Sequence, residues 1–447
     1  MANLSGISRR QALRLGLALG VAGPLASACG GGGFSTSGGG GGEGQLSFLS
    51  TQFTPVEEKE RFIKILGGLS NVGPVNFVSA EPGQLTTQVR SQVGAGKVEI
   101  NLIGGLHGDL APLADGQLED LTDLANELKD KAYPEDFLEL SKAGTDRNWY
   151  IPWAQATYVV AINKKAQEWL PSGADIQDLT YDQYLAWAKA AKEATGTPQF
   201  GLPGGPKGLL HRFLQGYLYP SFTGGQVTTF ASDEAVTLWE YLKELWTYCN
   251  PASTNFDNMQ EPLAAGQATV AWDHVARLVD APKDKPEDWI MVPAPKGPEG
   301  RGFMAVLTGM AIPKGAPDQD KTKSLIKALS EANVQLDVLR QNAFFPTVKA
   351  EVPSDLPPAV QLEADAVRAQ ADSPDALVAL PPVGLGQRDG EMTKIYKDCF
   401  TAIVLQNSDI RATLEAQAKN MQALLDDAKA SCWAPDDGTK GETCKVG

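Results

Sequence analysis

Short apolar runs alternate with amphipathic stretches near the start of the main body of the chain. We predict strands at 45–50, 75–79 and 98–103, and helices at 54–69 and 84–93, where apolar residues recur at helical spacing. The first helical stretch begins with Thr54, Pro55 and two acidic residues, which are typical of a helix N-terminus. This strand–helix alternation predicts a doubly wound α/β domain, whose ligand site lies beyond the carboxyl ends of its strands.

The most informative apolar stretch lies within residues 148–164. Residues 157–162 are β-branched, aromatic or small and apolar, which predicts a strand buried on both faces. Just before it, two tryptophans and a tyrosine surround Pro152, which fixes its own φ and biases Ile151 toward an extended conformation. An extended aromatic segment that enters a core strand is suited to a crossing between two lobes.

Periodicity predicts further helices at 184–194, 234–248 and 320–339. The second of these carries Trp239, Tyr241, Leu242 and Trp246 at helical spacing, so we expect these side chains in the core. A strand at 200–202 precedes a glycine-rich loop at 204–208, in which Lys207 is expected to be solvated.

Length and charge limit the possible functions. The body from residue 45 onward has about 400 residues, more than a single core usually supports, so two domains are expected. The net charge is −15, and removal of residues 1–28 takes away three arginines and no acidic residues, which leaves 36 basic against 54 acidic residues. Such an acidic chain is a poor candidate for binding nucleic acid or anionic lipid surfaces.

Residues 1–28 predict an export signal. Ser8, Arg9 and Arg10 resemble a twin-arginine motif, and residues 15–28 are apolar but shorter than the roughly 20 residues that span a bilayer. Residues 25–29 resemble a bacterial lipobox, so we expect lipidation at Cys29. Ordinary signal-peptidase cleavage, with an incidental Cys29, is the alternative. The stretch 29–44 is mostly Gly and Ser and would serve as a flexible tether.

Four cysteines remain in the body of this exported chain, and an even count suggests two disulfides. Cys432 and Cys444 bracket a polar, turn-rich tail, so we predict that they pair. Subtraction then leaves Cys249 with Cys399.

A further pattern is the order of three segments, at 149–152, 161–164 and 179–184. In this order the chain resembles the extracellular solute-binding proteins of sugar importers, the maltose-binding-protein-like group. In that family a Tyr-x-x-Pro segment leads into an apolar strand ending in Tyr-Asn-Lys, and a helix opening with Thr-Trp-Asp-Glu follows. Residues 149–152, 161–164 and 179–184 match this order, with Ala161 in place of Tyr and Tyr181 in place of Trp. Weaker likenesses extend over most of 45–427, at 113–121, 262–272, 289–295 and 302–312, and at 344–347, which resembles the family's Pro-x-Arg hinge segment.

The resemblance implies an α/β, two-lobed periplasmic-binding-protein-like fold of type II, in which each lobe is a sheet flanked by helices, with a hinge between them. We expect lobe I at 45–153 plus 305–345 and lobe II at 154–304 plus 346–447. It also implies a monomer that delivers a small solute to the permease of an ABC transporter and touches the membrane only through a lipid anchor.

No catalytic or cofactor signature is found in the sequence. The histidines His107, His211 and His274 are far apart in sequence and lack metal-ligand spacing, so no metal is expected. Residues 94–97 hint at a phosphate loop but lack its upstream Gly, and Val98 stands where Ser or Thr holds the metal. No esterase elbow is found. A glycosidase carboxylate pair stays open, because 54 acidic residues make chance pairs inevitable.

Sugars bind to aromatic faces and planar polar side chains, so residues of both kinds at the predicted strand ends and hinge are the candidate ligand-binding set. From the first lobe these are Gln52, Phe53, Glu81, Gln84, His107 and Asp109. From the hinge and second lobe they are Trp153, Gln155, His211, Trp272, Asp273, His274 and Phe303. Core packing is the alternative for Trp153 and Trp272, and helix capping is the alternative for Glu81 and Asp109.

This set is aromatic and neutral-polar with few cations, which favours a neutral sugar, an oligosaccharide or a polyol. We therefore expect an exported, lipid-anchored receptor that is not an enzyme. Two rivals remain: the same fold binding a polyamine or another cation, and a surface carbohydrate-active enzyme.

Overall fold

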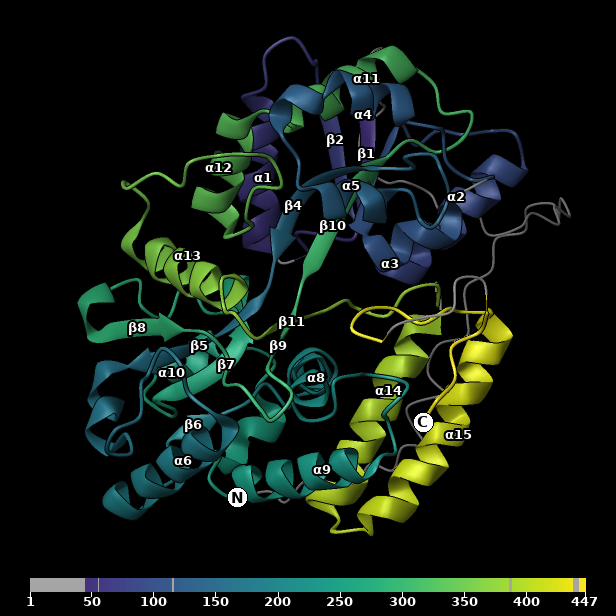
Figure 1. The fold of residues 1–447 in the computed structure, drawn as a ribbon. Helices are drawn as coiled ribbons and strands as arrows, with labels where there is room; N and C mark the ends of the chain where they lie inside the picture. Colours follow the sequence, from purple (N-terminus) through teal and green to yellow (C-terminus); the bar gives the residue numbers. More distant parts are fainter. Residues whose placement is uncertain (1–44, 55, 115, 386–387, 437–441) are drawn as a thin grey trace, which may run out of the picture. The chain divides into compact units, whose positions relative to one another are not determined.

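A computed structural model describes residues 45–447, apart from 55, 115, 386–387 and 437–441. The predicted signal segment, Cys29 and the Gly/Ser-rich stretch lie outside these residues. The described part of the chain has two main sheets with helices packed around them (Figure 1). None of its helices is long and apolar enough to cross a membrane.

The first sheet has five strands in the order β2-β1-β3-β10-β4. They are β1 (Leu46–Ser50), β2 (Val75–Ser79), β3 (Leu102–Leu106), β4 (Ile151–Ala156) and β10 (Val306–Ala311). β2, β1 and β3 are parallel, and α1 (Val56–Gly67) and α2 (Pro82–Gly94) connect them, as the predicted alternation requires. The other helices of this part, called lobe I, are α3 (His107–Leu110), α4 (Thr122–Glu127), α5 (Glu135–Ser141), α11 (Gln319–Leu329) and α12 (Ala332–Asn342).

The second sheet, in the part called lobe II, has the order β6-β7-β5-β8. Its strands are β5 (Tyr158–Asn163), β6 (Phe200–Gly201), β7 (Val270–His274) and β8 (Trp289–Val292). A separate parallel pair consists of β9 (Arg301–Met304) and β11 (Ala376–Ala379). The helices are α6 (Tyr181–Thr195), α7 (Leu210–Phe213), α8 (Tyr219–Thr223), α9 (Asp233–Trp246), α10 (Gln260–Ala264), α13 (Pro358–Ala371), α14 (Asp389–Phe400) and α15 (Ile410–Ala428).

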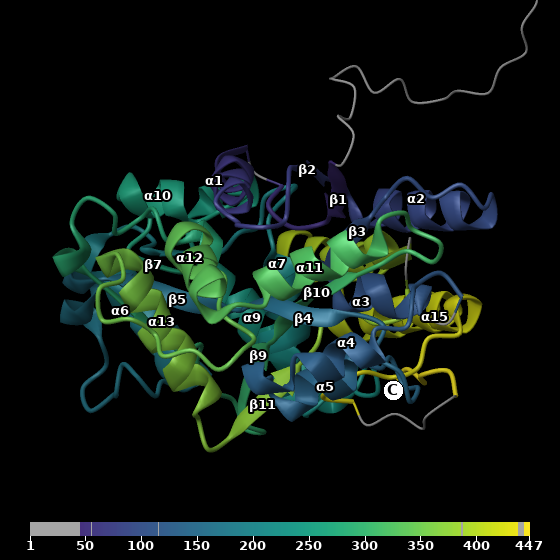
Figure 2. The same cartoon turned by 90° about the horizontal axis from the view of Figure 1, so that it is seen from above.

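Three connections join the lobes. β4 leads into β5 through Thr157, and β9 leads into β10 through Ala305 (Figures 1 and 2). The Thr157 hydroxyl donates to the Met304 carbonyl at 2.8 Å, which ties these two connections together. The third connection follows α12, where Phe345 exchanges two backbone hydrogen bonds with Gln155 of β4, with N–O distances of 2.9 and 2.7 Å. The hinge predicted at 148–164 and 344–347 thus consists of hydrogen-bonded neighbours.

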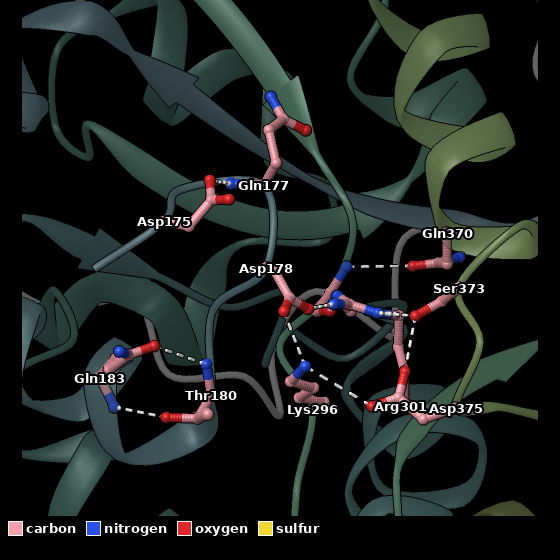
Figure 3. A network of polar contacts seen from close by, with 11 residues as sticks. Asp175, Gln177, Asp178, Thr180, Gln183, Lys296, Arg301, Gln370, Ser373 and Asp375 are labelled. Carbon is pink, nitrogen blue, oxygen red and sulfur yellow. Dashed lines mark hydrogen bonds and ion pairs between the residues drawn. The ribbon is translucent and has the colours of Figure 1, made fainter. Parts of the chain in front are cut away.

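A polar network around the buried Arg301 supports the lobe II side of this hinge (Figure 3). The Arg301 guanidinium is 2% exposed, pairs with Asp178 and donates to the Ala294 carbonyl. The Ala294 amide in turn donates to Gln370 Oε1 at 3.0 Å, and Gln370 Nε2 donates to the Thr157 hydroxyl at 3.2 Å. Because a buried charge is costly unless it is paired, this network fixes the geometry of the turn between β8 and β9 relative to the hinge.

Two predicted elements were misplaced. The strand expected at 98–103 is β3, four residues further along, because the amides of Glu99 and Ile100 bond to Gln92 Oε1 instead of to a neighbouring strand. The helix expected at 320–339 is two helices, α11 and α12. They are separated at Ser330, whose hydroxyl bonds back to the Ile326 carbonyl at 2.8 Å and favours a helix end.

The cysteine predictions had different outcomes. Cys432 and Cys444 form a disulfide, as predicted. The predicted pairing of Cys249 with Cys399 is wrong, because both are buried free thiols. Their surroundings differ: Cys249 follows α9 and interacts with Tyr184 and Tyr241, whereas Cys399 lies in α14. Burial raises the pKa of the Cys249 thiol to about 12, so it is unreactive at neutral pH.

Candidate functional site

The carboxyl ends of β1 and β3 bring polar side chains together in lobe I. Gln52 Nε2 donates to the Thr51 hydroxyl at 3.0 Å, and that hydroxyl donates to Asp109 Oδ2 at 3.2 Å. The same Asp109 oxygen accepts from the Leu106 amide at 3.0 Å, so the carboxylate also caps α3. Burial raises the Asp109 pKa to about 6. Of the predicted residues, Gln52 and Asp109 therefore lie in one hydrogen-bonded group.

The other polar candidates of lobe I lie apart from this group. His107 Nδ1 is 2.8 Å from the Tyr150 hydroxyl, and burial lowers the His107 pKa to about 4, so the ring is neutral near pH 7. Glu81 and Gln84 are exposed at the start of α2. The Glu81 side chain makes no hydrogen bond to the helix N-terminus, so the capping alternative is wrong for this residue.

Phe53 and Trp153 belong to an aromatic cluster that reaches toward lobe II. Their ring centroids are 5.8 Å apart, and both rings pack on Phe62. Phe53 has a left-handed backbone, with φ of 55°, which turns its ring into this cluster. Phe344 packs 5.0 Å from Phe53 and 5.8 Å from the His274 ring, so it links the aromatic cluster of lobe I to β7 of lobe II.

Three neighbouring candidates on β7 have different surroundings. Trp272 is fully buried and stacks on Tyr158 with a centroid distance of 4.8 Å. Asp273 is also fully buried, and it accepts from the Met259 amide at 2.9 Å and from the His274 amide at 2.7 Å. Burial raises its pKa to about 7. His274 is half-buried, faces Phe344, and has a pKa lowered to about 3 by burial and then by Arg277.

Two further candidates lie at the hinge. Gln155 is half-buried, and its Nε2 donates to the Pro346 carbonyl at 2.9 Å, so it braces the third connection. Phe303 is half-buried on β9, in register with Val378 of β11.

A cavity of about 250 Å³ lies in lobe II between the glycine-rich loop, α7 and α14. It is lined by Gly204, Gly205, Pro206, Gly208, Leu210, His211, Leu214, Thr254, Tyr396, Lys397, Phe400, Thr401 and Leu405. We call it the lobe II pocket. The loop needs glycine here, because a Cβ on Gly208 would lie 2.1 Å from the Pro203 carbonyl oxygen. None of the described residues that line the pocket carries a carboxylate, although the whole chain is strongly acidic.

His211 is the most unusual side chain of this pocket. It is 93% buried, and none of the described atoms hydrogen-bonds to its Nδ1. Its pKa lies well below the ordinary value because of burial and then the charges of Arg212, Lys397 and Arg277. The ring is therefore neutral, with one donor and one acceptor nitrogen. Buried polar atoms in proteins nearly always have a partner, so an unpaired nitrogen in a pocket wall points to a ligand.

Sequence reasoning missed the charged residues of lobe II that face lobe I. Arg212 Nη2 lies 3.7 Å from Asp389 Oδ2, and both residues act on the pKa of Asp109 in lobe I, Asp389 raising it and Arg212 lowering it. A similar group connects Glu58 of α1 with Arg277. Burial raises the Glu58 pKa to about 7, and the charges of Arg61 and then Arg277 oppose this shift. Arg212 directly follows His211 in the chain, which was the available signal, whereas nothing in the pattern singled out Arg277 or Asp389.

The structure has two sheets flanked by helices, and adjacent chain crossings join them. Polar groups from the two parts face each other. These features define a two-lobed binding-protein fold. The chain belongs to the bacterial extracellular solute-binding protein family, whose model matches residues 74–336. No curated protein matches the chain.

Solved structures share the fold. Maltose-bound MalE3 of T. maritima has a TM-score of 0.69 at 20% identity, over 85% of this chain and 100% of that chain. The GacH receptor of Streptomyces glaucescens, solved unliganded and with acarbose, has a TM-score of 0.66 at 16% identity, over 86% and 98%. A Thermotoga lettingae ABC transporter solute-binding protein bound with α-D-tagatose has a TM-score of 0.65 at 16% identity, over 85% and 99%.

Proposed function

We propose that this protein is an exported, lipid-anchored receptor that captures a neutral sugar, either an oligosaccharide or a polyol, and passes it to the permease of an ABC transporter. Family membership supports solute binding, and the chemistry of the lobe II pocket supports the ligand class. The single observation that carries the proposal is the buried and neutral His211, whose Nδ1 has no hydrogen-bond partner among the described atoms, in a pocket wall without carboxylates.

The lobe II pocket has the two features that a sugar requires. Leu210, Leu214 and Phe400 form an apolar wall that suits the C–H face of a pyranose ring. His211 and Lys397 supply polar groups for hydroxyls, and Lys397 Nζ is already oriented by a 2.9 Å bond to the Pro206 carbonyl. In small-molecule sites, a few precisely placed polar groups in an apolar pocket fix the orientation of the ligand and provide specificity.

The same lining disfavours the first rival ligand. A polyamine needs carboxylates, and the lobe II pocket offers a lysine instead. Catalysis of glycoside hydrolysis needs two carboxyl groups about 5 to 9 Å apart across the substrate, and the pocket supplies none from its described lining residues. Binding without turnover is therefore the function that this site supports best.

We infer that lobe I completes the site by hinge closure. In this proposal the lobes follow the predicted division, 45–153 plus 305–345 for lobe I and 154–304 plus 346–447 for lobe II, except that residues 154–156 go to lobe I because β4 ends at Ala156. Gln52, Asp109 and the neighbouring candidates of lobe I would contact the ligand only when the lobes approach each other. Such contacts make the ligand bind the closed state more tightly than the open state. Ligand binding therefore shifts the population toward the closed state.

The test is a thermal-shift screen of residues 45–447 with mono-, di- and oligosaccharides, polyols and polyamines. A ligand at a hundred times its Kd adds about 2.7 kcal/mol to the free energy of unfolding, which raises the midpoint by several degrees. The proposal expects a shift with one sugar class and no product after prolonged incubation. A shift with polyamines alone, or release of a cleaved sugar, would contradict it. Mass analysis of protein made from the full-length chain tests the lipid at Cys29 separately.

A further inference from the structure

The disulfide-closed tail is not accounted for by ligand capture. Residues 430–436 and 442–447, called the tail segment, follow α15 and return to the loop between α8 and α9. The Gly447 amide donates to the Val227 carbonyl at 3.2 Å, and the Ala231 amide donates to the Gly447 carbonyl at 2.6 Å. The tail is therefore bound at its far end as well as by the disulfide.

Asp436 is the main anchor of the tail. Its carboxylate is 5% exposed and accepts from the amides of Gln226 at 2.8 Å, Val227 at 3.0 Å and Thr228 at 2.9 Å. Gly225 makes this approach possible, since a Cβ there would lie 2.7 Å from Asp436 Oδ1. Charge-assisted bonds to several backbone amides are stronger than neutral ones, so the tail holds this loop firmly.

Gln226 connects the tail to two further parts of lobe II, one through its side chain and the other through its main-chain carbonyl. The side chain accepts from Trp433 Nε1 at 3.1 Å and donates to the Ala434 carbonyl at 3.2 Å, both in the tail. It also donates to the Leu380 carbonyl at 3.1 Å, while the Leu380 amide donates to Ala434 at 2.9 Å. The Tyr396 hydroxyl, whose residue lines the lobe II pocket, donates to the Gln226 carbonyl at 3.2 Å. One glutamine thus joins the tail, the chain at 380 and the pocket wall.

The stretch 379–382 contacts both the hinge and lobe I. The residue before Leu380, Ala379, accepts from the amide of Ala305, the residue through which β9 passes into β10. Two residues after Leu380, the Pro382 carbonyl oxygen lies 2.3 Å from where a Cβ on Gly108 would stand, so α3 of lobe I packs directly on this stretch. Asp109, a candidate ligand residue, is the next residue of α3.

We propose that the tail segment is a positioning element of the ligand site, which acts through Gln226 by holding residues 380–382 against the hinge and against α3 of lobe I. The tail touches no ligand itself. Its disulfide keeps Trp433 and Asp436 in place on Gln226 and its neighbours. This inference does not depend on which solute is bound, and its test needs no ligand.

The test is hydrogen–deuterium exchange on residues 45–447 as wild type, as Gln226→Met and as the double variant Cys432→Ser with Cys444→Ser. Methionine keeps the volume of Gln226 and removes its side-chain hydrogen bonds. Lys445→Ala is the matched control, because Lys445 lies in the same tail but is exposed and pairs only loosely with Asp426, at 3.6 Å.

We expect exchange in peptides covering 380–385 and α3 to become about tenfold faster in both variants, with β7 unchanged, because local opening is governed by local hydrogen bonds. The control should match the wild type. Faster exchange confined to the tail and the 225–231 loop would overturn the proposal, and so would a uniform increase over the whole chain, which indicates general destabilisation. If Gln226→Met fails to fold, wild type with its disulfide reduced is measured against the same two outcomes.

Discussion

Residues 272 to 274 differ in surroundings although they are consecutive. Trp272 and His274 point to the same face of β7, as alternate residues of a strand do, and both rings contact Tyr158. Yet Trp272 is fully buried, whereas His274 lies at the strand end beside Phe344. Distance from the strand end, rather than residue type, decides which of them is available to a ligand.

The burial of Trp272 leads to a stability prediction. Replacing it with alanine leaves a large cavity against Tyr158, Phe213 and Tyr217, so we expect a loss of about 3 to 5 kcal/mol in the free energy of unfolding. Urea denaturation followed by circular dichroism measures it. Ile63→Ala, on the exposed face of α1, is the control and should change stability by less than about 0.5 kcal/mol. A loss below about 1 kcal/mol for Trp272→Ala would contradict its core role.

The raised pKa of Asp109 predicts that the free energy of unfolding depends on pH. Its pKa is raised from 3.8 to about 6, so the fold favours the protonated form. The stabilisation from protonated Asp109 is complete below pH 3.8 and is lost as the pH rises through 6. Relative to Asp109→Asn, the wild type should therefore lose up to about 3 kcal/mol of unfolding free energy between pH 4 and 7.

The comparison with Asp109→Asn is needed because His107 has the opposite effect. Its pKa is lowered from 6.5 to about 4, so its contribution to stability rises with pH over that window. Both proteins contain His107, and its effect cancels in the difference. Denaturation curves at pH 4, 5, 6 and 7 give the free energy of unfolding of the wild type minus that of Asp109→Asn. If this difference stays constant or grows with pH, Asp109 is already ionised in the folded protein at pH 4, which would contradict the prediction.

At this scale the sequence predicted residue types better than residue roles. Gln52 and Asp109 were placed together because the carboxyl ends of parallel strands meet at one edge of a sheet, and the structure joins them through Thr51. Arg277 could not be found this way, because it follows β7 by three residues and its approach to Glu58 depends on the relation of the two lobes.

The hinge shows how elements, rather than single residues, fix the site. The Tyr217 hydroxyl, on the π-helical turn Leu214–Leu218, lies 3.0 Å from the Thr157 hydroxyl, accepts from the Tyr158 amide at 3.0 Å and donates to the Tyr158 carbonyl at 3.0 Å. Gln370 of α13 contacts the same two residues. The lobe II side of the crossing is therefore rigid, and bending is left to the links before Thr157 and after Met304.

Tyr217→Phe tests this reading of the hinge. Removing the hydroxyl leaves the buried Tyr158 amide without its partner, so we expect a loss of about 1 to 3 kcal/mol in stability. We also expect a wider distribution of distances between spin labels placed on α2 and α6, because the crossing loosens. Tyr248→Phe, a tyrosine outside the hinge, serves as the control. An unchanged distance distribution for Tyr217→Phe would place the hinge motion elsewhere.

The elements that the sequence predicted well are those with strong local signals, and β1 and β2 lie where they were predicted. The helix predicted at 184–194 is α6, which begins three residues earlier because Thr180 and Gln183 form a capping box there. The break between α11 and α12 was missed because Ser330 is compatible with either a helix interior or a helix end, and only its tertiary surroundings decide.

At the scale of the whole molecule, the fold followed from the order of weak motifs, since no single one was specific. The lobe II pocket could not be predicted in the same way. It combines residues 204–214 with residues 396–405, nearly two hundred positions apart, and the second stretch has only the pattern of a packing helix. Lys397 therefore went unnoticed, although it supplies the lysine of the pocket.

The central claim is that a neutral sugar binds to this molecule at the lobe II pocket. Isothermal titration of the sugar that gives the largest thermal shift, with the wild type, His211→Ala and Lys207→Ala, tests it most directly. Lys207 is exposed in the same loop and is the matched control. For His211→Ala we predict a Kd at least tenfold higher, which is a loss of about 1.4 kcal/mol of binding free energy, and for Lys207→Ala we predict no change in Kd. Equal affinity in all three proteins would show that the ligand does not bind at the lobe II pocket.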